Sequence, residues 1–266
     1  MMVPGVASVT FRGKSPQEII KLAVKAGLHS IEWGADVHVP TGHLEQAITI
    51  SRQTKEAGLI VSAYGSYYVV GKNSDKGKEF ADVLNTAEAL NAPVIRIWAG
   101  HKSSAESTQA YLRKILDETR LLADKAGQKG ICLAFEFHDN TLNDTYSACC
   151  ELLTELAHPQ IKTYWQPLHG AGPAINGAGI KMILPWIVGV HVFHWWPKAE
   201  VRLPLSEGIN DWKQYVLQLC KISDTISCNL EFVKDNSAEQ FLKDANTLQE
   251  LLGFQQESKN YSHLNH

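Results

Sequence analysis

LAFEFH (residues 133–138) is the first of four segments that decide the fold, and it is followed by TYWQPLH (163–169), VGVHVFHW (188–195) and NLEFV (229–233). Each segment is a short apolar run, typical of a buried β-strand, with a carboxylate, amide or imidazole near its end. Side chains at the C-terminal ends of the strands of a parallel barrel meet at one mouth. We therefore expect four of them to converge on a single ion: Glu136, Gln166, His191 and Glu231.

The same alternation of strand-like and helix-like segments continues along the whole chain and gives eight units. The predicted strands cover residues 5–11, 30–34, 60–66, 94–100, 131–138, 162–167, 187–195 and 227–233. The predicted helices cover residues 15–26, 43–57, 76–91, 105–126, 145–156, 174–184, 210–223 and 237–252. Eight such units are typical of an α/β protein that folds as a single-domain (β/α)8 TIM barrel. An open doubly wound sheet would place a glycine-rich phosphate loop after its first strand, and the sequence after Phe11 contains none.

Length and composition agree with one barrel. The chain has 266 residues, of which 44% are hydrophobic and 20% are charged, as in an ordinary globular enzyme. We predict that residues 1–254 form the barrel domain. Residues 255–266 are polar and lack periodicity, so we predict a C-terminal tail there. Ser15, Pro16 and Glu18 together predict a capped start for the first helix.

The charge balance and the N-terminal residues restrict partners and location. A formal net charge of −3 offers no basic surface to a phosphate backbone, so we expect no nucleic-acid partner. No segment approaches the length of a membrane span, and the first residues lack the regions of a secretory signal. Five cysteines without CxxC spacing are expected to be reduced thiols. These features predict a cytoplasmic protein without a membrane partner, and they leave homo-oligomer formation open.

Glu136 and Glu231 interrupt strands that are otherwise apolar. A carboxylate in such a place is costly to bury unless it is paired or bound to metal. For either residue alone, a salt bridge to a Lys or Arg explains the burial equally well. The same strand-end position for both residues, with His191 between them in the chain, favours a metal site.

Two carboxylates, an imidazole and an amide oxygen form a mixed donor set for one divalent metal ion. Mn2+ is the first choice because carboxylate-rich sites favour harder ions, and Mg2+, Co2+ or Zn2+ also fit. Such an ion polarises a carbonyl, while carboxylates on opposite faces of a substrate move a proton between carbons. This chemistry is that of sugar isomerases and epimerases, and it indicates Glu136 and Glu231 as the catalytic pair.

The order of these residues is similar to that of the xylose isomerase-like (sugar phosphate isomerase/epimerase) TIM-barrel superfamily. It resembles the branch that contains ketose 3-epimerases, hydroxypyruvate isomerase, inosose dehydratase and endonuclease IV, and the likeness covers essentially the whole chain as a fold. The resemblance implies that Glu136 and Glu231 are metal ligands that also serve as acid and base. It implies that His191 is the imidazole ligand and that His169 binds substrate oxygens.

The chain departs from that superfamily at three positions. The ligand after the sixth strand is usually Asp, and here it is Gln166, which lowers the formal negative charge of the site by one. Leu142 replaces a second carboxylate that epimerases carry six residues after the first Glu. Pro197 replaces an arginine six residues after the imidazole ligand, and Arg202 is the nearest arginine to that place. The departures weaken a specific assignment as a ketose 3-epimerase.

Aromatic and polar side chains at strand ends predict a carbohydrate pocket, since indoles stack on the C–H faces of sugars. Trp33 and Trp195 are the preferred pocket indoles. Glu32 orients a substrate hydroxyl or pairs with Arg96 or Lys234, and His138 lies on the same side of its strand as Glu136. The complete set of predicted substrate contacts is His138, His169, Trp33, Glu32, Trp195, Arg202 and Lys234.

Three functions remain open from the sequence. The first is a metal-dependent isomerase or epimerase that moves a proton next to the carbonyl of a small sugar, sugar acid or keto-polyol through an enediolate. The second is a dehydratase, a lyase that expels water from a cyclic keto-polyol with the same ion and base. The third is a non-catalytic carbohydrate-binding barrel that no longer holds a metal.

Overall fold

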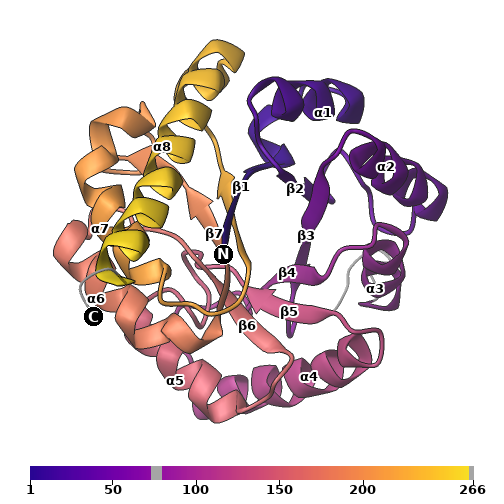
Figure 1. Ribbon diagram of the computed structural model, residues 1–266. Coiled ribbons are helices and arrows are strands. Elements are labelled where there is room, and N and C mark those ends of the chain that lie inside the picture. The colour runs from indigo at the N-terminus through magenta and orange to yellow at the C-terminus, as the bar shows by residue number, and fades with distance from the viewer. Residues whose placement is uncertain (73–79, 264–266) are drawn as a thin grey trace.

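The computed structural model describes residues 1–72 and 80–263, with residues 254–263 described by their backbone alone. Eight parallel strands form a closed barrel in the order β1-β10-β7-β6-β5-β4-β3-β2. Figure 1 shows the helices as an outer ring around these strands. The fold is therefore the predicted (β/α)8 TIM barrel. None of the described helices combines the length and the apolar character needed to cross a membrane.

The barrel strands and the helices alternate along the chain. The barrel strands are β1 (Met2–Ala7), β2 (Ser30–Gly34), β3 (Ile60–Val69), β4 (Val94–Trp98), β5 (Cys132–Phe135), β6 (Ile161–Trp165), β7 (Ile187–Val192) and β10 (Ile226–Leu230). The α-helices are α1 (Pro16–Lys25), α2 (Leu44–Glu56), α3 (Phe80–Ala89), α4 (Gln109–Gly127), α5 (Tyr146–Leu156), α6 (Pro173–Ile183), α7 (Ile209–Leu219) and α8 (Ala238–His263). Short 3-10 helices are η1 (Ser8–Phe11), η2 (Ser104–Glu106), η3 (Leu184–Trp186), η4 (Leu205–Gly208) and η5 (Lys234–Asn236).

Two helix boundaries follow from local chemistry that the sequence already contains. The Ser15 side chain accepts a hydrogen bond from the backbone N–H of Glu18, whose carboxylate accepts one from the backbone N–H of Ser15. This capping box, with Pro16 in the first turn, fixes the start of α1 as predicted. At the other end of the chain, α8 continues to His263, well beyond residue 252, where we predicted the last helix to end. The first residues of the predicted helix 76–91 lie outside the described residues.

The first strand differs from its prediction. We expected a strand over residues 5–11, but β1 ends at Ala7 and the chain then turns into η1. Side chains replace the strand pairing there, because the N–H of Gly34 donates to Ser8 Oγ and the N–H of Phe232 donates to Thr10 Oγ1. The turn carries Arg12, which follows η1, toward the mouth of the barrel.

The seventh strand is also shorter than predicted. β7 ends at Val192, and residues His194–Trp195 form β8, which pairs antiparallel with β9 (Arg202–Leu203). Trp195 lies directly opposite Arg202 in this pairing. The β8–β9 hairpin is an addition to the barrel, and it brings an indole and a guanidinium to the cavity described below.

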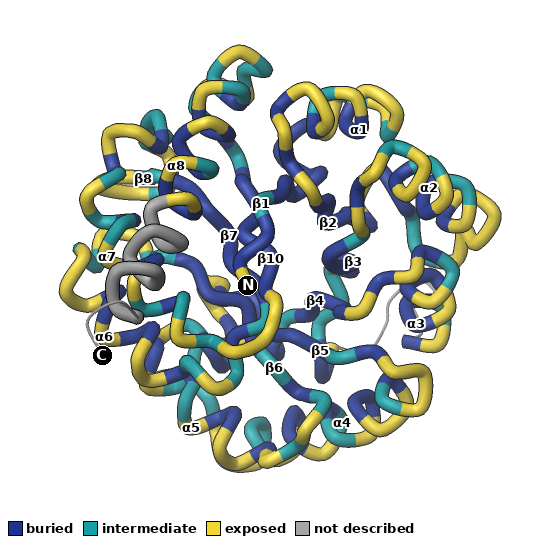
Figure 2. The backbone as a smooth tube through the Cα atoms, viewed as in Figure 1, coloured by how far each residue is buried: buried dark blue, intermediate teal, exposed yellow. Residues whose placement is uncertain are grey.

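The core has two parts. Figure 2 shows that the barrel strands are mostly buried and that the surrounding helices are partly exposed. A large apolar cluster lies between the strands and the helices. Inside the barrel, a small cluster of Ala63, Val94, Ala134 and Tyr164 is apolar. The remaining interior carries charged side chains that are almost inaccessible to solvent, among them Glu32, Arg96 and His191. Burial of these charges requires that they compensate one another.

Candidate metal centre and substrate cavity

Glu136 follows the last residue of β5, and one of its two carboxylate oxygens is hydrogen-bonded by residues of the neighbouring strand. Its Oε2 accepts hydrogen bonds from the Arg96 guanidinium and from the Trp98 indole, the latter at 2.6 Å. Arg96 also donates to Glu32 at 2.6 Å, so one buried guanidinium bridges two carboxylates. Arg96 and Trp98 lie on β4, next to β5 in the barrel. With Oε2 occupied in this way, Oε1 of Glu136 is left facing the centre of the mouth.

His191 lies on β7, and each of its ring nitrogens is within hydrogen-bond distance of a partner. Nε2 is 3.1 Å from Glu32 Oε2, and Nδ1 is 2.9 Å from Gln166 Oε1. The Gln166 amide nitrogen donates to the carbonyl of Phe137, which fixes the amide oxygen toward His191. Burial alone lowers the pKa of His191, but Glu231, Glu32 and Glu136 outweigh it and raise the pKa to about 9. Glu32 thereby orients the imidazole so that Nδ1 faces the mouth.

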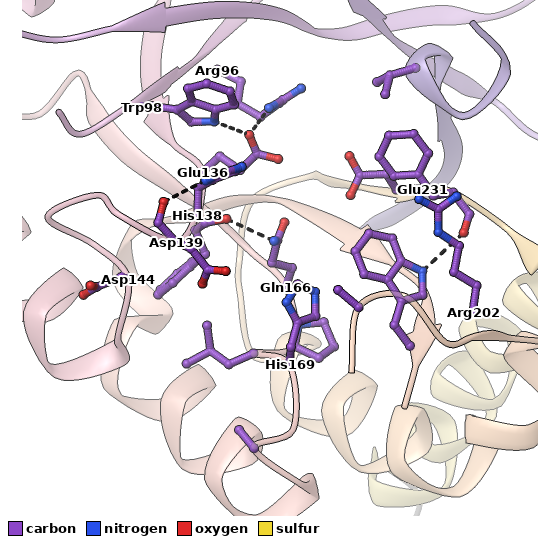
Figure 3. A pocket seen from close by; sticks show the side chains of 18 of the residues that line it. Arg96, Trp98, Glu136, His138, Asp139, Asp144, Gln166, His169, Arg202 and Glu231 are labelled. Carbon is purple, nitrogen blue, oxygen red and sulfur yellow. Dashed lines mark hydrogen bonds and ion pairs between the residues drawn. The ribbon is translucent and has the colours of Figure 1, made fainter. Parts of the chain in front are cut away.

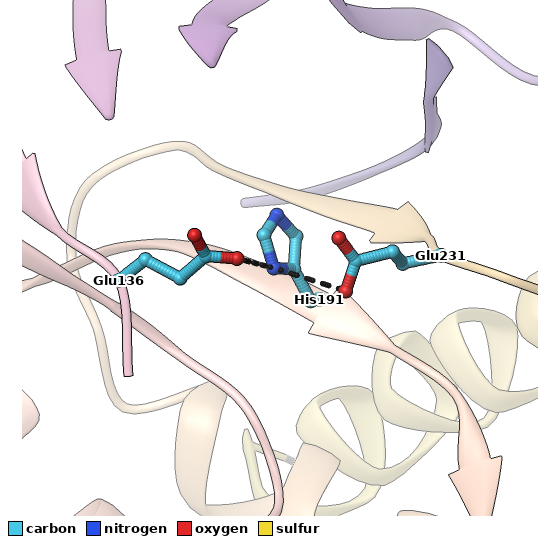
Figure 4. A group of neighbouring side chains, drawn as sticks. All are labelled: Glu136, His191 and Glu231. Atoms are coloured by element: carbon cyan, nitrogen blue, oxygen red, sulfur yellow. Dashed lines mark ion pairs between the residues drawn. The ribbon is translucent and has the colours of Figure 1, made fainter. Parts of the chain in front are cut away.

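Glu231 follows the last residue of β10 and completes a buried group of three with Glu136 and His191. Nδ1 of His191 is 3.4 Å from Glu136 Oε1 and 3.4 Å from Glu231 Oε2. Figure 4 shows the imidazole between the two carboxylates. One ligand atom from each of the three residues lies within 4.8 Å of the other two. The three residues are thus close enough to bind one ion.

The charges around this group fit a divalent cation. Three buried carboxylates, those of Glu32, Glu136 and Glu231, face one permanent cation, Arg96. The imidazolium form of His191 leaves this set one positive charge short, whereas a divalent ion with neutral His191 balances it. The amide oxygen of Gln166 points to the same place as the other donors. These four residues would hold the ion, and the donor set suits Mn2+, Mg2+, Co2+ or Zn2+.

Glu231 differs from Glu136 in its contacts. Within the described part of the chain, its carboxylate makes one polar contact, with His191. Burial raises the pKa of Glu231, and the negative charge of Glu136 adds to this, against His191 and Arg96. By contrast, Arg96 and His191 outweigh burial at Glu32 and hold the pKa of that carboxyl well below its usual range. Glu231 is therefore the carboxylate of this network best suited to accept a proton.

A cavity of about 770 Å³ opens above the ligand group at the mouth of the barrel. Figure 3 shows Arg96, Trp98, Glu136 and His138 on one side and Glu231 with Arg202 on the other. Gln166 and His169 lie between these sides in the same view. The volume is that of an ordinary small-molecule site.

Four of the predicted substrate contacts line this cavity: His138, His169, Trp195 and Arg202. The His138 ring packs on Trp98 with 4.7 Å between ring centroids, and His169 stacks on Trp195 at 5.2 Å. Burial lowers the pKa of His169. The two histidines line the cavity from different loops, and Trp195 supplies the predicted indole wall.

The other predicted contacts lie elsewhere. Trp33 is completely buried and donates its indole N–H to Thr54 of α2, so it packs between barrel and helix and does not reach the cavity. Adjacent residues of a strand face opposite sides, and Glu32 occupies the inner side of β2. Glu32 lies beneath the cavity, paired with Arg96 and His191 rather than open to a substrate. Lys234, in η5, is not among the described residues that line the cavity.

Several lining residues were not predicted from the sequence as site residues. Arg12, Tyr67 and Phe232 line the cavity, as do Asp139 and Asp144. Arg96 appeared only as a partner for Glu32. Arg96 carried a signal that was available, because a charged residue in the apolar segment VIRIW predicts a buried ion pair just as Glu136 does. Arg12 gave no such signal because it follows η1 in an irregular segment, and Tyr67 lies in β3 just beyond residue 66, where we predicted that strand to end.

Comparison with known proteins agrees with the geometry. Residues 20–254 match the model of a family described as the xylose isomerase-like TIM barrel. A 3-dehydroshikimate dehydratase of Bacillus anthracis is 27% identical to this chain over 199 residues, which are 70% of this chain and 69% of that protein.

Solved structures show the same fold. The probable 3-DHS dehydratase AsbF from Bacillus anthracis has a TM-score of 0.79 at 20% identity, covering 94% of this chain and 99% of that one. The IolI protein with a bound zinc atom has a TM-score of 0.76 at 17% identity, covering 94% and 98%. A D-psicose 3-epimerase has a TM-score of 0.69 at 17% identity, covering 95% and 100%. The named similar proteins thus include a dehydratase and an epimerase.

Proposed function

The chain belongs to the xylose isomerase-like TIM barrel family, and from that premise we propose that it is a metal-dependent dehydratase, a lyase that removes water from a small cyclic hydroxy ketone. The main support for this proposal is that Glu136 and Glu231 differ in their polar contacts. Glu136 is hydrogen-bonded by Arg96 and Trp98, whereas Glu231 has a raised pKa and, among the residues that the structure describes, a single polar contact. One free base is what an elimination needs. The similarity to a 3-dehydroshikimate dehydratase supports the same reaction class.

The chain's own residues are arranged for this reaction. A divalent ion bound by Glu136, Gln166, His191 and Glu231 would polarise the ketone carbonyl and acidify the neighbouring C–H bond. Glu231 takes the proton from that carbon. A carbon–carbon double bond forms and the C–O bond at the next carbon breaks, and a cavity histidine, His138 or His169, protonates the departing hydroxide, which leaves as water. The products are an unsaturated ketone and one water molecule.

An isomerase or epimerase, our first prediction from the sequence, is the second candidate. It shares the first proton transfer, but it must return a proton to the substrate from a second group. Glu136 is that group in the resemblance, and its Oε2 already accepts hydrogen bonds from Arg96 and Trp98. The D-psicose 3-epimerase among the similar structures is the observation that favours this candidate. We keep Mn2+ as the proposed ion and the cytoplasm as the proposed location.

Product analysis tests the reaction. Metal-loaded protein is incubated with 3-dehydroshikimate, with an inosose and with D-psicose, and the products are examined by mass spectrometry. We expect a product one water lighter from a cyclic ketone. A product of unchanged mass and altered stereochemistry would establish the epimerase instead. Failure to retain any divalent ion after loading with Mn2+, together with no turnover, would favour the non-catalytic carbohydrate-binding barrel.

Substitution of Glu231 tests its role as the base. Glu231→Gln should lower kcat by about 10³-fold, because the amide cannot accept the proton, while the circular dichroism spectrum stays unchanged. Glu45→Gln, at an exposed position of α2, is the matched control and should leave kcat unaltered. Full activity in Glu231→Gln would remove this carboxylate from the mechanism.

A further inference from the structure

We propose that Arg12 and Arg202 form an anion subsite that binds a carboxylate of the substrate, at the Glu231 side of the cavity. This inference rests on the proposed function, because it selects acids among the cyclic hydroxy ketones as the substrate class. The subsite is defined by three residues, Arg12, Arg202 and Phe232, all of which line the cavity.

The two guanidinium groups lie around one aromatic ring. The central carbon of Arg12 is 5.1 Å from the centroid of the Phe232 ring, and that of Arg202 is 4.6 Å from it. Arg202 also lies 5.4 Å from the Trp195 ring centroid. Because Phe232 directly follows Glu231, the subsite adjoins the carboxylate that we assign as the base. Figure 3 shows Arg202 on the Glu231 side, across the cavity from Glu136.

Three residues that contact these arginines have a left-handed backbone conformation. Tyr67, Phe232 and Asn236 have positive φ angles of 56°, 47° and 49°. Each of them contacts one or both arginines, since Arg12 donates to the Tyr67 hydroxyl and Arg202 donates to Asn236 Oδ1 at 3.0 Å. A left-handed conformation is sterically unfavourable for a residue with a side chain. Such strain persists where surrounding contacts impose it, and it gathers at functional sites.

The backbone of Phe232 is fixed at both of its polar groups. Its N–H donates to Thr10 Oγ1 at 3.1 Å, and its carbonyl accepts from the Trp195 indole at 3.2 Å. These bonds join η1, which leads to Arg12, and the β8–β9 hairpin, which carries Arg202. The segments that carry the two arginines are thus both hydrogen-bonded to the Phe232 backbone. The arginines are therefore positioned before a ligand binds.

The positive charge here is only partly neutralised. Arg12 pairs with Asp36, but in the described part of the chain no carboxylate oxygen lies within 4.0 Å of the Arg202 guanidinium. Burial lowers the pKa of Arg202, with Glu231 opposing and the charge of Arg12 adding to the effect. Lys14 lies nearby, on a second hollow of about 390 Å³ that shares both arginines. An anion between the arginines would relieve this unbalanced charge.

A carboxylate fits this subsite because guanidinium groups bind carboxylates through paired, charge-assisted hydrogen bonds. A ring with its ketone at the Glu136–His191–Glu231 end and its carboxylate at the arginines is anchored at two points. That orientation fixes which C–H bond faces Glu231. Remote binding of this kind contributes to the rate by holding the reacting carbon in place.

Binding of a non-reacting acid tests the subsite directly. Shikimate and its methyl ester differ only in the carboxylate charge and one methyl group, and neither is a ketone. Titration calorimetry on Mn2+-loaded protein should show that shikimate binds about tenfold or more tightly than the ester. Arg202→Met and Arg12→Met should each reduce this ratio to within about threefold, and Arg202→Lys should retain an intermediate preference. Arg52→Met, at an exposed position of α2, is the matched control and should preserve the ratio.

Several outcomes would overturn the subsite. The first is equal binding of shikimate and its ester by the unaltered protein, and the second is no binding of either probe. The third is an unchanged ratio of the two affinities in both methionine variants when these unfold at the same temperature as the unaltered protein. Inorganic phosphate that binds more tightly than shikimate, and loses this binding in Arg202→Met, would replace the carboxylate with a phosphate. Acid preference without water loss from any ketone would refute only the dehydratase. Water loss from neutral ketones without acid preference would refute only the subsite.

Discussion

Gln166 is the proposed ligand that would set the strength of the candidate metal centre. The superfamily that this chain resembles usually has Asp at this position, and the amide supplies an oxygen without a charge. Glu32 would compensate for a neutral ligand, because it adds a buried carboxylate 3.1 Å from Nε2 of His191. The negative charge that Gln166 lacks on the Nδ1 side of His191 is therefore supplied by Glu32 on the Nε2 side. A carboxylate bonded to the far nitrogen of a ligand histidine also increases its basicity.

Restoring the usual ligand should tighten metal binding. We expect Gln166→Asp to raise Mn2+ affinity about tenfold, since one more negative charge would face the ion. Gln166→Ala, which removes the oxygen, should lower the affinity. Competition with a chelating indicator measures both. Weaker binding by Gln166→Asp than by the unaltered protein would show that the hydrogen bond from Gln166 to the Phe137 carbonyl matters more than the charge.

At the scale of the elements, β6 and β7 support the imidazole through a close contact. Gly189 on β7 lies against the Tyr164 ring of β6, and a Cβ atom there would lie 2.4 Å from that ring. The same ring lies 4.9 Å from the imidazole of His191. Glycine is thus required for close approach, and the tyrosine fills the barrel directly beside the ligand group.

Filling this space should destabilise the barrel. Gly189→Ala is expected to lower the free energy of unfolding by about 1–3 kcal/mol, because the ring or the strand must shift. Urea denaturation measures the change. Gly253→Ala in α8 is the matched control, since a Cβ there meets nothing within 4 Å, and it should be neutral or slightly stabilising. Equal stability of Gly189→Ala and the unaltered protein would mean that the ring has room to move.

At the scale of the whole molecule, buried charges couple metal binding to pH. In the metal-free protein the pKa of His191 is raised to about 9 from an ordinary value of 6.5. The folded state therefore binds more protons than the unfolded state between these values. The stabilisation from this group is complete below about pH 6.5 and is lost as the pH rises through 9.

Metal affinity should rise over the same interval. Because the ion binds the neutral imidazole, uptake releases a proton from His191, and affinity should increase by up to about tenfold per pH unit until it levels near pH 9. Isothermal titrations at several pH values test this. Glu32→Gln removes a charge that raises the pKa of His191, so its affinity should level at lower pH. Affinity that does not change with pH would mean that His191 is already neutral.

The sequence by itself determined the barrel and the strand ends that bear the ligands. Eight alternating units and their turn residues predicted the fold, and a carboxylate in each of two apolar strands indicated Glu136 and Glu231. These signals are local, because hydrophobic period and burial cost are properties of short segments. They did not distinguish the two faces of β2. Trp33 and Glu32 are neighbours in the chain, and we predicted both as substrate contacts, with Arg96 as an alternative partner for Glu32. The Trp33 indole packs on α2 instead, and Glu32 pairs with Arg96 beneath the cavity.

Only the tertiary structure decided which distant side chains share the cavity. Arg12 and Arg202 are brought together by η1, by the β8–β9 hairpin and by the left-handed turn at Phe232, and none of these has a regular period in the sequence. Arg96 became part of the centre because β4 lies next to β5 and its guanidinium reaches across to Glu32. The pairing of charges depends on closure of the ring of strands, and closure is a long-range property that no short segment contains.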